Sequence, residues 1–294
     1  MEGLKLFPVE YLRMTLEIGV LLGIGTMLLW GVSDAIIRIP TKAVGAYQTL
    51  FYNRILQFAY FLLFALFVPV PQIEMWQVGA LMAISVVFLI AKYAILRAIN
   101  LGEVSIAFPI GNSWGALGTV LAIVLLNESI PQAAVPIIAA IFVGVVLVSI
   151  SKLSGLKISK EAPFALVAMA GWAIAYTGID YFAKGMGQIY PLLITEGFML
   201  LWLMGMHAGT EHKLKLVPKY FGIMCLTAFL FALGFVLFAT APAYGVASVA
   251  IPLATASPAV VVVLARVLYK EELEPHQLIG VAIIILGIVG LALC

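Results

Sequence analysis

The chain has 294 residues, of which 64% are hydrophobic and only 10% are charged. A soluble domain is roughly half apolar and about a quarter charged, so these proportions exclude an ordinary soluble fold and predict a protein embedded in lipid. The formal net charge is +2, and no basic stripe interleaved with aromatic residues occurs, which argues against a nucleic-acid partner. Two cysteines are too few for a disulfide framework.

The apolar residues form long continuous runs rather than the alternating ten-residue segments of a transmembrane barrel. Each run has about the 20 residues that a spanning helix needs. The runs cover residues 17–38, 47–68, 76–97, 104–126, 132–151, 162–182, 188–207, 218–240, 246–268 and 275–293. Prolines mark several run ends, for example Pro40 after the first run and Pro275 at the start of the last. The sequence therefore predicts an all-α polytopic membrane protein with ten transmembrane helices and short connections.

The first run resembles a signal peptide, but Arg13 and Glu17 precede more than 18 apolar residues and no small-residue cleavage site follows, so we expect a retained helix. No lipidation or retrieval motif occurs, which makes a multi-pass location in a prokaryotic plasma membrane the default expectation. Lysines at 152–160, 213–219 and 270 gather in connections on the side opposite to the N-terminus. The positive-inside rule therefore favours both termini outside.

The second half of the chain repeats the first. Residues 98–109 and 241–252 both read Ala-x3-Gly-x2-Ser-x-Ala-x-Pro, and the same offset of 143 pairs Glu128 with Glu271. The earlier parts of the halves align with an offset of 142, which pairs Trp30 with Trp172. We divide the chain into a first repeat (1–150), a polar linker (151–161) and a second repeat (162–294).

Each repeat holds five predicted helices, and an odd number inserts the second copy with the opposite orientation. Inverted repeats predict a binding site near the membrane midplane between the copies and two equivalent conformations open to opposite sides. Transport by alternating access follows from this architecture.

These residues carry a family resemblance. Trp30-Gly31 and Gly171-Trp172 stand late in the first helix of each repeat, Arg54 stands early in the second helix, and the run from Ala98 through Pro109 leads to Glu128. In these features the chain resembles a ten-helix, EamA-type member of the drug/metabolite transporter superfamily. The second copy departs from the pattern by placing Glu196 where the first has Arg54. The resemblance implies two EamA-type repeats and efflux of amino acids or other metabolites.

Ionisable residues inside lipid are costly, so each is a candidate for function. Asp34 and Arg38 are spaced i, i+4 on one helix, and Asp180 and Lys184 repeat this spacing. Either pair could neutralise itself at a helix end, with the cation reaching the interface. We expect Asp34 and Asp180, which lie nearer the interior, to bind substrate.

Arg54 lies too deep in its helix for easy contact with headgroups and needs a partner. The repeat symmetry points to Glu196, and we expect an ion pair between them that acts either as a gate or as a structural clamp.

Further candidates lie on the third and fourth predicted helices. Lys92, with Tyr93 beside it, could bind a substrate carboxylate or pair with Asp34. Pro109 removes a backbone hydrogen bond shortly before Asn112, which predicts either carbonyl groups open to a cavity or a kink repaired by Ser and Thr side chains. Aromatic residues at interior levels could line a pocket or contact a cation: Trp30, Trp114, Trp172 and Tyr176. Glu128 and Glu271 precede helices, and we expect each to cap the helix that follows it.

Acids and bases together suit a zwitterion, so we expect a secondary carrier for a small polar metabolite such as an amino acid, with one carboxylate free to carry a coupling proton. A multidrug or lipophilic-cation exporter is the alternative. An enzyme is disfavoured because the three histidines fall at helix ends or in connections without metal-ligand spacing, and a channel because no filter-like loop occurs. No cofactor or metal motif is present, and the sequence leaves a monomer and a dimer equally open.

Overall fold

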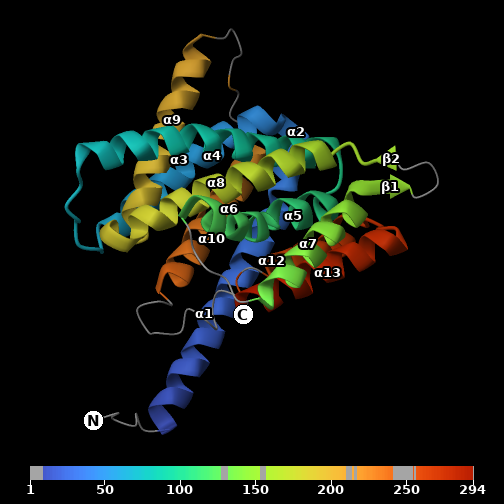
Figure 1. The fold of residues 1–294 in the computed structure, drawn as a ribbon. Helices are drawn as coiled ribbons and strands as arrows, with labels where there is room; N and C mark the ends of the chain where they lie inside the picture. The colour runs from blue at the N-terminus through green and yellow to red at the C-terminus, as the bar shows by residue number, and fades with distance from the viewer. Residues whose placement is uncertain are drawn as a thin grey trace.

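The computed structural model describes residues 9–126, 132–152, 157–209, 214, 217–240, 254 and 256–293. Helices dominate, as the apolar runs predict, and they pack into one bundle (Figure 1). The first half contains α1 (Val9–Ile36), α2 (Arg38–Val44), α3 (Ala46–Ala65), α4 (Met75–Leu101), α5 (Val104–Asn112), α6 (Trp114–Leu126) and α7 (Ala134–Ser149). The second half contains α8 (Ala162–Met186), α9 (Ile189–Ala208), α10 (Pro218–Thr240), α12 (Ser257–Tyr269) and α13 (Pro275–Leu293).

Between the halves, β1 (Ile150–Lys152) and β2 (Lys157–Ile158) pair antiparallel and project beside the end of α7 (Figure 1). This hairpin occupies part of the linker predicted at 151–161.

Several helices are long and apolar enough to cross a membrane. Within the described residues five segments meet both criteria: Leu21–Val44, Met75–Leu101, Ala162–Ala183, Ile189–Ala208 and Pro218–Phe238. Three shorter apolar helices lie at Val135–Ser149, Ser257–Tyr269 and Pro275–Gly290. These helices agree with a polytopic membrane protein, while the full count of ten spans stays a prediction.

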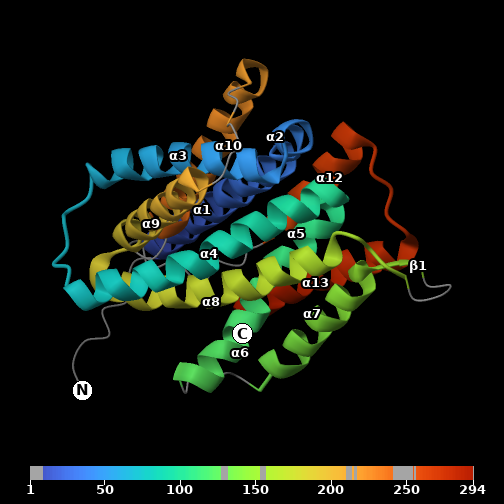
Figure 2. The same ribbon diagram turned by 90° about the horizontal axis from the view of Figure 1, so that it is seen from above.

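The helices of the two halves pack in exchanged pairs, as Figures 1 and 2 show. The first helix of each half packs against the third main helix of the other, so α1 lies along α10 and α8 lies along α4. Helix α3 packs against its counterpart α9, and α7 packs against α13. This exchange is the arrangement that a two-fold relation between the repeats requires, and it places the middle of the molecule at their interface.

One polar stripe joins α1 to α10. Three side chains of α1 spaced by about one helical turn donate hydrogen bonds to carbonyl oxygens of α10: Thr26 to Gly234 (3.3 Å), Trp30 to Phe231 (3.2 Å) and Ser33 to Thr227 (3.0 Å). In lipid such bonds hold helices together because apolar contact with a helix offers little advantage over contact with a lipid tail.

The fourth predicted span is broken, and the break differs from the one expected at Pro109. Pro109 lies inside α5, and the interruption comes at Ser113 between α5 and α6. The Ser113 hydroxyl donates to the Pro109 carbonyl oxygen (2.8 Å), while its backbone N–H bonds to Ile110 instead. The alternative in which a serine repairs the backbone therefore describes this site better than carbonyls open to a cavity.

Two further expectations about helix ends are corrected. Pro40 does not end the first helical region but lies in the first turn of α2, where proline is tolerated because the N–H there needs no partner. Glu271 does not cap the helix that follows it, since Gln277 accepts the Glu274 N–H at the start of α13 (3.0 Å). Glu128 lies outside the described residues.

Glycines allow α7 and α13 to cross closely. A Cβ added at Gly280 would lie 2.8 Å from the Gly144 carbonyl oxygen and 2.9 Å from the Leu147 Cβ. Real Cβ atoms do not approach backbone so closely, so the contact between these helices depends on both glycines.

We therefore expect Gly280→Ala to destabilise the protein, because the methyl group must push α7 and α13 apart. Overpacking of this kind costs about 1–3 kcal/mol. The measurement is the thermal midpoint of the detergent-solubilised protein, with Gly205→Ala on α9 as the control because a Cβ there meets no atom within 4 Å. Equal midpoints for the two variants would contradict the close crossing.

Candidate substrate-binding cavity

A cavity of about 90 Å³ lies at the interface of the two repeats. Because a single buried water needs roughly 10–15 Å³, the cavity has room for several waters or a small molecule. Its walls come from helices of both halves: Trp30, Ser33, Asp34, Ile37, Leu50, Asn53, Arg54, Gln57, Lys92, Ile95, Leu96, Phe108, Asn112, Trp114, Trp172, Tyr176, Phe231, Phe235, Phe238 and Ser257.

Lys92 places a buried ammonium group among aromatic rings. Its side chain is 8% exposed, and its Nζ lies 4.2 Å from the ring centre of Phe231, 5.0 Å from Phe88 and 5.4 Å from Trp172. Ring faces attract a cation but accept no conventional hydrogen bond. Within the described part of the chain, Lys92 has neither an ion-pair partner nor a hydrogen-bond acceptor, and its donors are available to a ligand.

Asp34 lies in the same cavity on α1, close enough to Lys92 for their charges to interact. The two do not form an ion pair in this conformation, in contrast to one of the alternatives drawn from the sequence; the two described ion pairs join other residues. Asn112 stands next to Asp34, and its Nδ2 is buried. The cavity thus holds an anion, a cation and an amide donor that a polar ligand could use.

Arg54 and Glu196 form the ion pair that the repeat symmetry predicts. Arg54 Nη1 lies 2.6 Å and 2.8 Å from the two carboxylate oxygens of Glu196, and the side chains are only 3% and 0% exposed. Arg54 Nη2 and Gln57 Nε2 both donate to Asn53 Oδ1 at 2.9 Å, and Asn53 Nδ2 donates to Thr227 at 3.2 Å. The network links α3, α9 and α10, so these helices are tied together across the repeat boundary.

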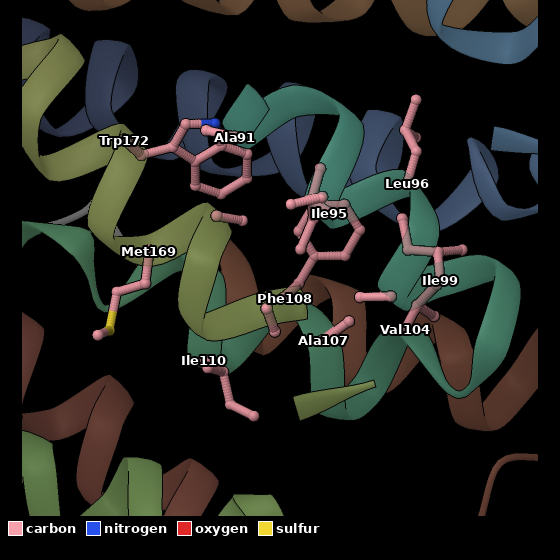
Figure 3. Close-up of a cluster of buried hydrophobic side chains, with 14 of the residues drawn as sticks. Ala91, Ile95, Leu96, Ile99, Val104, Ala107, Phe108, Ile110, Met169 and Trp172 are labelled. Carbon is pink, nitrogen blue, oxygen red and sulfur yellow. The ribbon is translucent and has the colours of Figure 1, made fainter. Parts of the chain in front are cut away.

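Aromatic rings form most of the remaining wall. Trp30 stacks on Phe231 with ring centres 6.2 Å apart, and Trp114 lies 4.6 Å from Tyr176. Figure 3 shows Trp172 of α8 near Ile95 of α4 and Phe108 of α5, in the apolar cluster that backs the cavity. The Trp172 Nε1 is buried without a hydrogen-bond partner.

Most of the residues predicted for the site come together at this cavity. Trp30, Asp34, Lys92, Asn112, Trp114, Trp172 and Tyr176 line it, as does Arg54. Tyr93 does not, because it is 39% exposed on the outer face of α4; a helix turns about 100° per residue, so the neighbour of an inward Lys92 points away. The side chains of Asp180 and Lys184 lie outside the described residues.

Sequence reasoning missed the face that α10 contributes. Phe231, Phe235 and Phe238 are spaced i, i+4 and i+7, which places them on one side of a helix, and all three line the cavity. This spacing can be found in the sequence alone. An aromatic stripe is also common on lipid-facing helices, however, so the stripe can be assigned to the cavity only when the packing of α10 against α1 is known.

Arg38 contacts a different partner from the one that its spacing indicates. It forms an ion pair with Glu271, which follows α12, rather than with Asp34. Close by, Glu161 accepts the Glu103 N–H (3.4 Å), and burial together with the Glu161 charge raises the pKa of Glu103 above its usual value.

Among the described residues, no group of three or more His, Cys, Asp or Glu side chains could hold a metal ion.

Comparison with curated proteins finds no match to the chain. A solved structure titled only as a crystal structure of a protein matches with a TM-score of 0.58 and 18% identity, covering 92% of this chain and 95% of that one. At this identity the likeness shows a shared fold.

A family model described as the EamA-like transporter family matches twice, over residues 17–150 and 159–293. The two matches correspond to the two halves that pack in exchanged pairs, and together they span nearly the whole chain. The chain therefore belongs to the EamA-like transporter family, whose members are membrane transporters of the drug/metabolite transporter superfamily.

Proposed function

We propose that this transporter is a secondary carrier for a small zwitterion, with amino acids as the substrate class, and that it works by alternating access around the central cavity. The observation that carries the proposal is Lys92, a buried cation that lacks a protein partner among the described residues and lies in one cavity with Asp34. A substrate carboxylate would bind Lys92, and a substrate ammonium group would bind Asp34.

The charges around the cavity support a substrate with no net charge. Arg54 and Glu196 neutralise each other, which leaves Asp34 and Lys92 as the groups with binding capacity to spare. A zwitterion offers an opposite charge to both Asp34 and Lys92 and does not change the net charge of the cavity. Neither side chain is then left as an unpaired charge in the membrane interior, where such a charge is costly.

The aromatic wall is the one feature that favours the alternative, an exporter of lipophilic cations. Lys92 argues against it, because a fixed ammonium group already occupies the position among Phe88, Trp172 and Phe231 that a ligand cation would take.

Asp34 is also our candidate for a coupling proton. Glu196 is held by two short contacts with Arg54, whereas Asp34 faces the cavity without an ion-pair partner in the described structure. We place the carrier in a prokaryotic plasma membrane, as the sequence led us to expect.

Counterflow in proteoliposomes tests the substrate class. We expect vesicles loaded with unlabelled amino acids to accumulate labelled amino acids, and not sugars, nucleotides or lipophilic amines. Lys92→Met and Asp34→Asn should each reduce the initial rate at least about tenfold, since a hydrogen bond to a charged group is worth about 1.5–3 kcal/mol. Tyr93→Phe is the matched control, because Tyr93 adjoins Lys92 but faces outward.

Exchange of lipophilic cations by the unmodified protein, together with an unimpaired Lys92→Met variant, would replace the zwitterion carrier with a multidrug exporter. Equal losses in Tyr93→Phe and Lys92→Met would show that the effect comes from the helix rather than from the ammonium group.

A second prediction concerns the Arg54–Glu196 pair. Arg54→Met should lower stability by about 3–5 kcal/mol, because it strands a buried carboxylate, and the double variant Arg54→Met with Glu196→Met should recover most of the loss. Thermal midpoints in detergent measure both. A single variant as stable as the parent would contradict the pairing.

Counterflow measured on the double variant, once its stability has been recovered, then assigns the role of the Arg54–Glu196 pair. Unimpaired counterflow would make it a structural clamp between α3 and α9, and lost counterflow in a folded protein would make it part of the gating machinery.

A further inference from the structure

A cluster of contacts lies next to one end of the cavity. Ile37 is the cavity-lining residue at the end of α1, and Arg38 follows it directly. Arg38 forms an ion pair with Glu271 just after α12, and its guanidinium carbon lies 4.5 Å above the ring of Tyr269. The Tyr269 hydroxyl donates to the Ala35 carbonyl oxygen (2.9 Å). Three contacts therefore join the junction of α1 and α2 in the first repeat to the end of α12 in the second.

The same carboxylate also binds the N-terminus of α5. Glu271 Oε1 accepts the Val104 N–H (3.2 Å), Oε2 accepts the Ser105 N–H (3.0 Å), and the Ser105 hydroxyl donates to Oε2 as well. A carboxylate at a helix N-terminus satisfies backbone donors that have no partner within the helix. Glu271 is thus shared between a cation at the end of α1 and the first turn of α5.

The backbone holds Glu271 in this position. Lys270 has φ = 56°, a left-handed backbone conformation that residues other than glycine rarely adopt. It ends α12, and the following N–H of Glu271 returns to the Ala265 carbonyl oxygen (3.4 Å). The turn directs the carboxylate inward, where its side chain is only 3% exposed.

We propose that Arg38, Tyr269 and Glu271 form a gate that closes one mouth of the cavity in this conformation. The elements that they join are α1 and α5 of one repeat and α12 of the other, and all three also contribute cavity walls through Asp34, Asn112 and Ser257. Opening the cavity toward this face requires α12 to separate from α1 and α5, which breaks the ion pair and uncaps α5. The proposal rests on the alternating-access part of the proposed function, and not on the identity of the substrate.

Sided labelling of a cavity cysteine tests the gate without any substrate. In a background of Cys225→Ser and Cys294→Ser, Leu96→Cys places a single thiol in the cavity wall. A membrane-impermeant maleimide is applied to right-side-out and to inside-out vesicles. A separate protein carrying Glu272→Cys, which is exposed beside Glu271, reports which vesicle surface bears the gate.

We expect slow labelling of the cavity thiol from the gate surface in the parent. Glu271→Gln should increase that rate at least about tenfold, as the loss of a charge-assisted interaction shifts a two-state equilibrium by this factor or more. Arg38→Gln removes the ion pair while leaving Glu271 to cap α5, and it should increase the rate in the same direction. Glu272→Gln is the matched control and should leave the rate unchanged.

Parent-like labelling rates in folded Glu271→Gln and Arg38→Gln proteins would overturn the gate, as would an equal increase in Glu272→Gln. If Glu271→Gln does not fold, Arg38→Gln decides alone by the same criterion. A change in labelling combined with failed amino-acid counterflow would keep the gate and reject the substrate class, and the reverse combination would reject the gate and keep the carrier.

Discussion

The cost of charge in lipid is the constraint on which this structure depends. A polar group in the bilayer must find a partner inside the protein, because no water is available to solvate it. Arg54 meets this requirement with Glu196, and the neighbouring amides of Asn53 and Gln57 extend the network to α10. The hydroxyls of Thr26 and Ser33 bond to carbonyl oxygens of α10 in the same way. Polar side chains therefore hold the helices together where apolar contact alone could not.

Lys92 and Asp34 stand out against this background. Their cavity lies between helices exchanged by the two repeats, with α1 along α10 and α4 along α8, so a shift of one repeat against the other changes its walls. The ring faces around Lys92 attract its ammonium group but accept no conventional hydrogen bond, so its donors have no partner within the described part of the chain. Such a group is costly to maintain in a purely structural role, which is the physical argument for assigning it to a ligand.

The sequence predicted the helical bundle, the duplication and most of the cavity, because each leaves a one-dimensional signal. Interior charges are rare enough in apolar runs to identify Asp34, Arg54 and Lys92, and the offset between the repeats identified Glu196. The errors arose where three-dimensional direction decides. Tyr93 faces outward, and Arg38 pairs with Glu271, which follows a helix of the other repeat that packs against α1. The approach of α12 to α1 is not encoded in local spacing.

Helix α5 connects the two features to which we assign roles in transport. Its first turn is capped by Glu271, and its last residue, Asn112, lines the cavity beside Asp34. The break at Ser113 separates this nine-residue helix from α6, and Pro109 has already removed one of its backbone hydrogen bonds. Helix α5 is therefore bounded by the Ser113 break at one end and by the Glu271 carboxylate at the other. A ligand that contacts Asn112 and a gate that closes at Val104 would therefore act on the two ends of the same short helix. Through this helix, a ligand between the repeats can influence the contact at the mouth of the cavity.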